Sequence, residues 1–306
     1  MSVDTFFTPL RYPGGKGKFA PVVKSIFNFN GLKGGHYLEP YAGGAGVALD
    51  LLYSGFVSDI HINDIDIAVY SFWKSITEHT DDFLKLLHDS PITIDEWHKQ
   101  KYILNDWSCT DHLLKGFAAF FLNRTNRSGI LKGGVIGGKK QDGNYTLDAR
   151  FNKANLSKRI EKVGANASRI HVYNEDALML IQKVDEFLPD NSLVYLDPPY
   201  YVKGQGLYRN FYVHEDHVKI REALDKIKSK WIVSYDNCDE IKEIYKNYQM
   251  TDYDLNYSAY HRIKAKEVMF FCDGLKNPQE YEPFFCYLDQ LGMIFLFLSI
   301  CNYESL

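Results

Sequence analysis

Six short apolar runs, separated for the most part by longer amphipathic stretches, constrain the fold of this chain more than any other feature. The runs cover residues 36–39, 61–64, 169–173, 193–196, 231–235 and 268–271. Such runs are typical of buried strands, and strands that alternate with helical patterns favour βαβ crossovers. We therefore expect an α/β protein built on a mainly parallel sheet.

The stretch between the second and third runs breaks this alternation. From residue 68 to residue 167 the pattern is first helical, with a helix expected at 113–122, and then glycine-rich and basic. Glycines permit unusual backbone angles, so residues 133–140 predict a basic hairpin or loop. We expect 1–67 and 168–275 to form one domain, 68–167 a mostly helical insertion, and 276–306 a tail of unknown role in which 291–301 form a packed helix.

Basic residues gather in the insertion although the whole chain is acidic. The 306 residues carry a net charge of −4. Between Lys115 and Arg169 twelve Lys and Arg stand against three Asp and Glu, so this segment carries +9 and the remainder −13. Such clustering indicates phosphate contacts with a duplex, and a solvated basic surface is the alternative.

Cysteine spacing and the N-terminal residues bear on the cell compartment. The five cysteines form no CxxC pair and their number is odd, which argues against a disulfide framework. The first nine residues lack the basic flank and apolar segment of a signal peptide, and 291–301 is too short an apolar stretch to span a bilayer. We expect a cytoplasmic protein without a membrane anchor.

A glycine loop follows the first apolar run and precedes a helix-like apolar stretch. Small residues at such a turn let a ligand approach the main chain. Asp64 ends the next run about 20 residues beyond Gly44, where an acid can bind ribose hydroxyls. The loop matches neither GxGxxG in its usual register nor a Walker loop, which favours a nucleotide-like ligand without a triphosphate.

The fourth apolar run ends in Asp197-Pro198-Pro199-Tyr200. Two prolines hold the flanking groups in a fixed, extended arrangement. The Asp197 carboxylate and the Pro198 carbonyl can accept hydrogens from an amine while Tyr200 stacks on a ring. The motif predicts a planar substrate with an amino group, and a strand ending at a proline-rich surface turn is the alternative.

Two further positions belong to the same expected pocket. In the glycine-containing segment 11–16, Tyr12 can cover a ligand and Lys16 can meet a carboxylate, although a surface turn is an equal alternative. Asp176, just after the third run, can accept from an adenine amino group, or it can cap a helix.

Taken together and in this order, the motifs resemble those of the Dam-type family of DNA adenine-N6 methyltransferases, in the alpha-group arrangement, over roughly residues 8–275. The resemblance implies a Rossmann-like methyltransferase sheet, S-adenosylmethionine as cofactor, and direct in-line transfer to an adenine flipped out of duplex DNA, without a metal or a covalent enzyme intermediate. The catalytic residues would be Asp197, Pro198, Pro199 and Tyr200. The cofactor would be bound by Tyr12, Lys16, Glu39, Pro40, Tyr41, Gly43, Gly44, Asp64, Asp176 and Asp197.

The insertion would then recognise the target site. We expect DNA contacts from Arg124, Asn126, Arg127, Ser128, Ile130, Lys132, Lys139 and Lys140. The chain departs from the family where glycine is replaced by Ala45, and where Arg127-Ser128-Gly129-Ile130 stands in place of the aromatic and Asn of GATC-modifying members, so GATC specificity is not carried over.

The resemblance also suggests restriction-modification, phage or host DNA marking, with a possible cognate restriction endonuclease and a monomer or weak dimer. Three alternatives stay open. They are an RNA adenine methyltransferase, a DNA-binding protein without activity, and transfer to the amine of cytosine, which usually goes with Ser at the position of Asp197.

Overall fold

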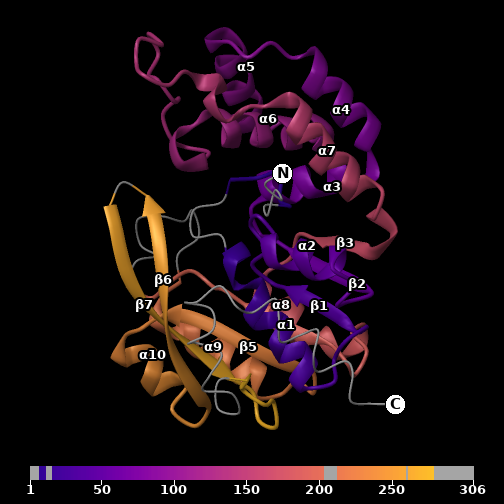
Figure 1. The fold of residues 1–306 in the computed structure, drawn as a ribbon, viewed down its shortest axis with the longest axis vertical. Coiled ribbons are helices and arrows are strands. Elements are labelled where there is room, and N and C mark those ends of the chain that lie inside the picture. The colour runs from indigo at the N-terminus through magenta and orange to yellow at the C-terminus, as the bar shows by residue number, and fades with distance from the viewer. Residues whose placement is uncertain (1–6, 12–15, 203–211, 260, 279–306) are drawn as a thin grey trace, which may run out of the picture.

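The computed structural model describes residues 7–11, 16–202, 212–259 and 261–278, and it confirms the expected α/β architecture (Figure 1). Its sheet has seven strands in the order β3-β2-β1-β4-β5-β7-β6. The first five pair in parallel, whereas β7 runs antiparallel to both β5 and β6. The strands are β1 (His36–Glu39), β2 (Asp59–Asn63), β3 (Ile170–Tyr173), β4 (Leu193–Leu196), β5 (Lys230–Asp236), β6 (Gln249–Ala259) and β7 (His261–Phe271).

The strands differ most from the predicted runs at β2, β7 and β6. Strand β2 begins earlier than expected and ends at Asn63, so Asp64 lies just beyond it. Strand β7 extends well before its apolar run. Strand β6 was not predicted, because it is an edge strand in which polar and apolar residues alternate and no continuous apolar run exists.

The sheet has a switch point between β1 and β4. From β1 the chain moves outward to β2, and from β4 it moves in the opposite direction to β5. Right-handed crossovers therefore place α2 (Gly46–Tyr53) and α9 (His214–Leu224) on opposite faces of the sheet. Helix α1 (Ala20–Phe29) packs against α2, whereas α8 (Ala177–Gln182) and α10 (Asp239–Ile244) contact α9. Ligands of open α/β sheets bind beside such a switch point, at the carboxyl ends of the strands.

Residues 67–164 contain helices and loops but no strand of the sheet. The helices are α3 (Ile67–Glu78), α4 (Thr80–Asp89), α5 (Ile94–Asn105), α6 (His112–Thr125) and α7 (Lys153–Gly164). Figure 1 shows α4 to α7 gathered at one end of the molecule. Helix α3 contacts both β3 of the sheet and α6 of this helical group, and so connects the two. The predicted helix at 113–122 lies within α6, and 133–140 form a loop of turns with one isolated bridge, Asn126 to Val135.

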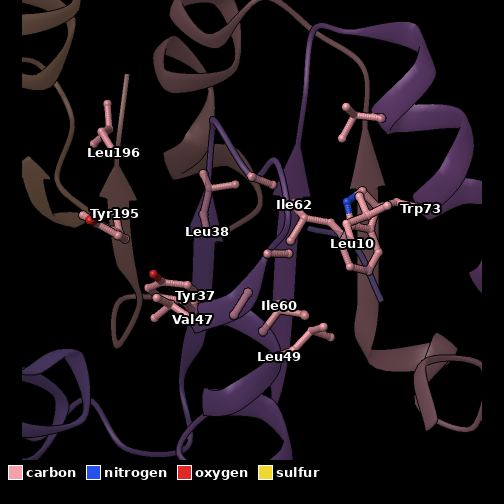
Figure 2. Close-up of a cluster of buried hydrophobic side chains, with 14 of the residues drawn as sticks. Leu10, Tyr37, Leu38, Val47, Leu49, Ile60, Ile62, Trp73, Tyr195 and Leu196 are labelled. Atoms are coloured by element: carbon pink, nitrogen blue, oxygen red, sulfur yellow. The ribbon is translucent and has the colours of Figure 1, made fainter. Parts of the chain in front are cut away.

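The core between sheet and helices holds the strand ends in place (Figure 2). Strand residues such as Leu38, Ile60 and Ile62 are buried against Val47 and Leu49 of α2. Burial of each such side chain stabilises the fold by roughly 1.5–3 kcal/mol. The loops that follow the strands therefore rest on a rigid base.

The structure bears on two further expectations, that the chain lacks a membrane anchor and that it lacks a disulfide framework. No described helix is long and apolar enough to cross a membrane. Cys109, Cys238 and Cys272 are free thiols. The helix predicted at 291–301 lies outside the described residues.

Candidate functional site

The glycine loop after β1 is held by contacts from two neighbouring elements. The buried Trp73 of α3 donates from Nε1 to the Gly43 carbonyl over 2.9 Å, and the Gly43 amide donates to Asp64 Oδ2 over 3.0 Å. Gly43 has φ +46° and Ala45, which precedes α2, has φ +45°. Ala45 thus takes a left-handed backbone, which a residue with a side chain seldom adopts and which favours glycine.

Asn63 joins the loops that follow three strands. Its Nδ2 donates to the Pro40 carbonyl over 2.9 Å and to the Glu175 carbonyl over 3.0 Å, and its Oδ1 accepts from the Glu175 amide over 2.9 Å. The sequence drew attention to Asn63 only as the neighbour of Asp64. The bonds show that it fixes the spacing of the loops after β1, β2 and β3.

Three acidic residues predicted for the cofactor lie at these strand ends. Asp64 accepts from the amides of Gly43 and Asp66, and burial raises its pKa to about 7. Glu39 is buried, accepts from the Tyr37 hydroxyl and from the Ala48 amide in α2, and has its pKa raised by burial to about 8.

Asp176 is exposed and caps α8 through Oδ1, which accepts from the amides of Leu178 and Met179. This is the cap that the sequence left open as an alternative. A contact of Asp176 with a ligand stays a prediction. On the other side of the glycine loop, Tyr41 shares a hydrogen bond of 2.9 Å with the hydroxyl of Tyr212.

The Asp197-Pro198-Pro199-Tyr200 motif leaves β4 next to the glycine loop, because β1 and β4 are neighbours. Asp197 Oδ1 accepts from Ser234 Oγ over 3.0 Å, and Ser234 is bonded to Tyr195 OH, also over 3.0 Å. Burial raises the pKa of Asp197, and the ammonium of Lys16, 3.5 Å away, opposes that rise.

The chain beyond the motif is tied to the end of β5. The buried Asp236 accepts from the amides of Tyr201 and Val202, each over 2.9 Å. Pro198 is buried and Pro199 half-buried, which leaves little freedom between Asp197 and this anchor.

A buried carboxylate on β7 completes this part of the site. Glu267 accepts from Lys16 Nζ, from Tyr200 OH over 2.5 Å and from Tyr253 OH over 2.6 Å, and Lys16 also donates to Tyr200 OH over 2.7 Å. Burial by itself would raise the pKa of Glu267, but Lys16 and these hydrogen bonds bring it below its ordinary value. Glu267 was not predicted as a site residue, since its only signal in the sequence is an acidic residue just ahead of an apolar run.

The structure therefore brings the predicted residues into two adjoining groups. Lys16, Asp197 and Tyr200 form one network, and the loop of Gly43 with Asp64 forms the other at the neighbouring strand end. Tyr12 lies outside the described residues.

Most residues predicted to contact DNA are exposed in the stretch between α6 and α7. Arg124 is half-buried instead. Asn126 is fully buried. Its Oδ1 accepts from Trp97 Nε1, and its Nδ2 donates to the carbonyls of Ile130 and Leu131. A direct contact of the buried Asn126 side chain with DNA stays a prediction. The exposed candidates are Arg127, Ser128, Ile130, Lys132, Lys139 and Lys140.

The sheet order with its antiparallel β7, and an acidic-aromatic motif beside a glycine loop, define a Rossmann-like methyltransferase. Residues 12–259 match the family of D12 class N6 adenine-specific DNA methyltransferases. The chain belongs to this family and is an adenine-specific DNA methyltransferase. It is also 20% identical over 239 residues, which are 72% of this chain and 80% of the relative, to the type II methyltransferase M.CviBI of Paramecium bursaria Chlorella virus NC1A. Membership implies S-adenosylmethionine as methyl donor and DNA as substrate.

Proposed function

We propose that this protein transfers a methyl group from S-adenosylmethionine to the N6 amine of an adenine that has been flipped out of duplex DNA. The observation that carries the proposal is the junction of β1 and β4. There the loop held by Asp64 adjoins the motif in which Lys16, Asp197 and Tyr200 are linked.

The residues of the glycine loop fit the proposed cofactor. Carboxylates at the ends of β1, β2 and β3 offer acceptors for hydroxyl and amino groups, and we assign Asp64 to the ribose and Asp176 to the adenine ring. Gly43 and Ala45 carry little or no side chain, so that a ligand can approach the main chain of the loop. When bound, S-adenosylmethionine supplies an electrophilic methyl carbon. The full proposed set is Tyr12, Lys16, Glu39, Pro40, Tyr41, Gly43, Gly44, Asp64, Asp176 and Asp197.

The Asp197-Pro198-Pro199-Tyr200 motif would hold the target amine. The Asp197 carboxylate and the Pro198 carbonyl accept its two hydrogens, and the Tyr200 ring stacks on the base. The nitrogen lone pair would then face the position from which bound S-adenosylmethionine would supply its methyl group, and the Asp197 carboxylate, as hydrogen-bond acceptor of the amine, would take the proton that N6 releases. Asp197 must be ionised for this role. Its buried position opposes ionisation, and the neighbouring Lys16 ammonium favours it.

The insertion would bind the duplex and supply specificity. Flipping the base costs a few kcal/mol of unstacking, which contacts from the exposed basic residues offset. We place the protein in restriction-modification or in phage or host DNA marking, where a cognate endonuclease can cleave unmodified DNA.

The proposal is tested by Asp197→Ala with purified protein, labelled S-adenosylmethionine and duplex DNA. We expect loss of methyl transfer while thermal unfolding and most DNA affinity are kept, because the change removes an acceptor and not a core contact. Asp190→Ala, a change at an exposed carboxylate, should transfer at the wild-type rate. Activity retained in Asp197→Ala would remove Asp197 from the mechanism, and DNA binding without transfer by the wild-type protein would point to an inactive binding protein.

The substrate is identified by sequencing modified adenines in DNA from cells that express the protein. Enrichment at one sequence gives the recognition site directly. Methylation of RNA but not of duplex DNA in the same purified assay would support the RNA alternative.

A further inference from the structure

Residues between α4 and α7 line an open cavity that the proposed transfer reaction does not use. Its volume is about 480 Å³, and it lies between α6, α7 and the short helix η3 (Leu147–Arg150). Its polar lining comes from Arg124, Asp148, Arg150, Asn152 and Asn155. Asp148 is the one carboxylate among the lining residues, and it already accepts the Thr146 hydroxyl.

Arg124 contributes a buried donor to this cavity. It stands in the last turn of α6, and its Nε is buried and has no hydrogen-bond partner among the described residues. Burial, and then the charges of Arg159, Arg11 and Arg150, lower the pKa of Arg124 to about 9, so its guanidinium is still charged at neutral pH. The half-buried Arg124 guanidinium has a buried Nε–H without a partner, which is unfavourable and indicates that a ligand completes the site.

Two neighbouring arginines are oriented by hydrogen bonds. Arg159 donates from Nε to Asn155 Oδ1 over 3.2 Å and from Nη1 to the Thr8 carbonyl over 2.9 Å. Arg11 donates from Nη1 to the Asn126 carbonyl over 3.2 Å. These bonds orient two further guanidinium groups near Arg124.

We propose that this cavity is a binding site for one phosphate group, held by Arg124 and Arg150. Guanidinium groups match the oxygens of a phosphate in pairs, and no base edge is needed for such recognition. The phosphate can come from a phosphodiester of bound DNA or from free phosphate. As a phosphodiester site, the inference rests on the proposed function and gives Arg124 the task of fixing the position of the duplex.

The anion site is tested first without DNA. Inorganic phosphate is added to the full-length protein at constant ionic strength, with chloride as reference, and the unfolding temperature is followed. A ligand that binds only the folded state raises this temperature. We expect a rise with phosphate that is absent in Arg150→Gln, an exposed position where folding is not at risk, and in Arg124→Gln, while Lys158→Gln on α7 keeps it.

The source of the phosphate is found from DNA affinity measured over a range of salt concentrations. The slope of log K against log salt is negative, and loss of one phosphate contact reduces its magnitude by about one. A lower slope in Arg150→Gln but not in Lys158→Gln identifies a phosphodiester of DNA. An unchanged slope together with the thermal effect identifies free phosphate.

The proposal is overturned if phosphate acts no more strongly than chloride and Arg150→Gln binds DNA with the wild-type slope. Neither the thermal effect nor the slope requires methyl transfer. Failure of the proposed function would therefore be seen separately, in the transfer assay.

Discussion

At the scale of single residues, Glu267 decides how charge is shared in the site. Two carboxylates, Asp197 and Glu267, lie beside one ammonium, Lys16. Glu267 takes the closer contact and is also bonded by Tyr200 and Tyr253. It therefore holds Tyr200 in place and, by its like charge, raises the pKa of Asp197 beyond the effect of burial.

Replacing Glu267 by Gln should change the pH dependence of methyl transfer. Removal of a negative charge lowers the pKa of Asp197 and leaves Lys16 to pair with it, so Asp197 stays ionised to lower pH. The acidic limb of kcat/KM, which reports the free enzyme, should move to lower pH. At neutral pH kcat should fall by roughly tenfold to hundredfold, because Tyr200 and Lys16 lose their fixed positions. Initial rates of transfer from labelled cofactor across pH measure both effects.

Glu243→Gln, at an exposed carboxylate of α10, provides the control and should leave the profile unchanged. An acidic limb that stays in place in Glu267→Gln, or moves to higher pH, would contradict the charge-sharing argument.

At the scale of elements, the end of α6 is joined to the segment that leads into the site. The buried Asn123 accepts from the Arg11 amide over 2.7 Å and donates to the carbonyls of Arg11 and Gly129. Gly129 has φ +75°, and a Cβ atom there would lie 2.2 Å from the Arg11 carbonyl oxygen. The joint between the end of α6 and the segment of Arg11 thus requires glycine on two grounds.

We expect Gly129→Ala to destabilise the protein more than Gly31→Ala does. Both positions have left-handed backbones, which cost a residue with a side chain about 1–2 kcal/mol. At Gly31 a Cβ meets nothing within 4 Å, whereas at Gly129 the Arg11 backbone must move. Each further kcal/mol lowers the unfolding temperature by roughly 2–4 °C in a chain of this size. Equal unfolding temperatures for the two variants would show that the Arg11 contact is not tight.

The same elements show what could be predicted from the sequence. Apolar runs identified β4 and β5, whose residues are almost all buried, and also the partly exposed edge strand β3. Strand β6 escaped because its polar and apolar residues alternate and form no continuous run. Asn123 and Asn126 carried no sign that they are buried, since their partners are main-chain carbonyls and amides brought close by the fold and an indole from another helix.

At the scale of the whole molecule, charge is divided between two parts of the chain. The segment from Lys115 to Arg169 carries +9 and the remainder −13. A duplex is attracted to the first and repelled by the second, so its approach is oriented before any specific contact forms. The exposed loop that carries Lys139 and Lys140 lies on the positive side of this division.

Changing both Lys139 and Lys140 to Glu should therefore weaken DNA binding and make it less sensitive to salt. If each lysine contacts one phosphate, the magnitude of the slope of log K against log salt should fall by about two, because each lost contact removes about one unit. A matched pair of changes outside the basic segment, Lys226→Glu with Lys276→Glu, alters the net charge equally at exposed positions and should leave the slope almost unchanged. Equal losses in the two pairs would mean that net charge alone governs binding. An unchanged slope in the first pair would mean that the loop is a solvated surface. The phosphate contacts would then come from Arg127, Lys132 and the cavity of Arg124.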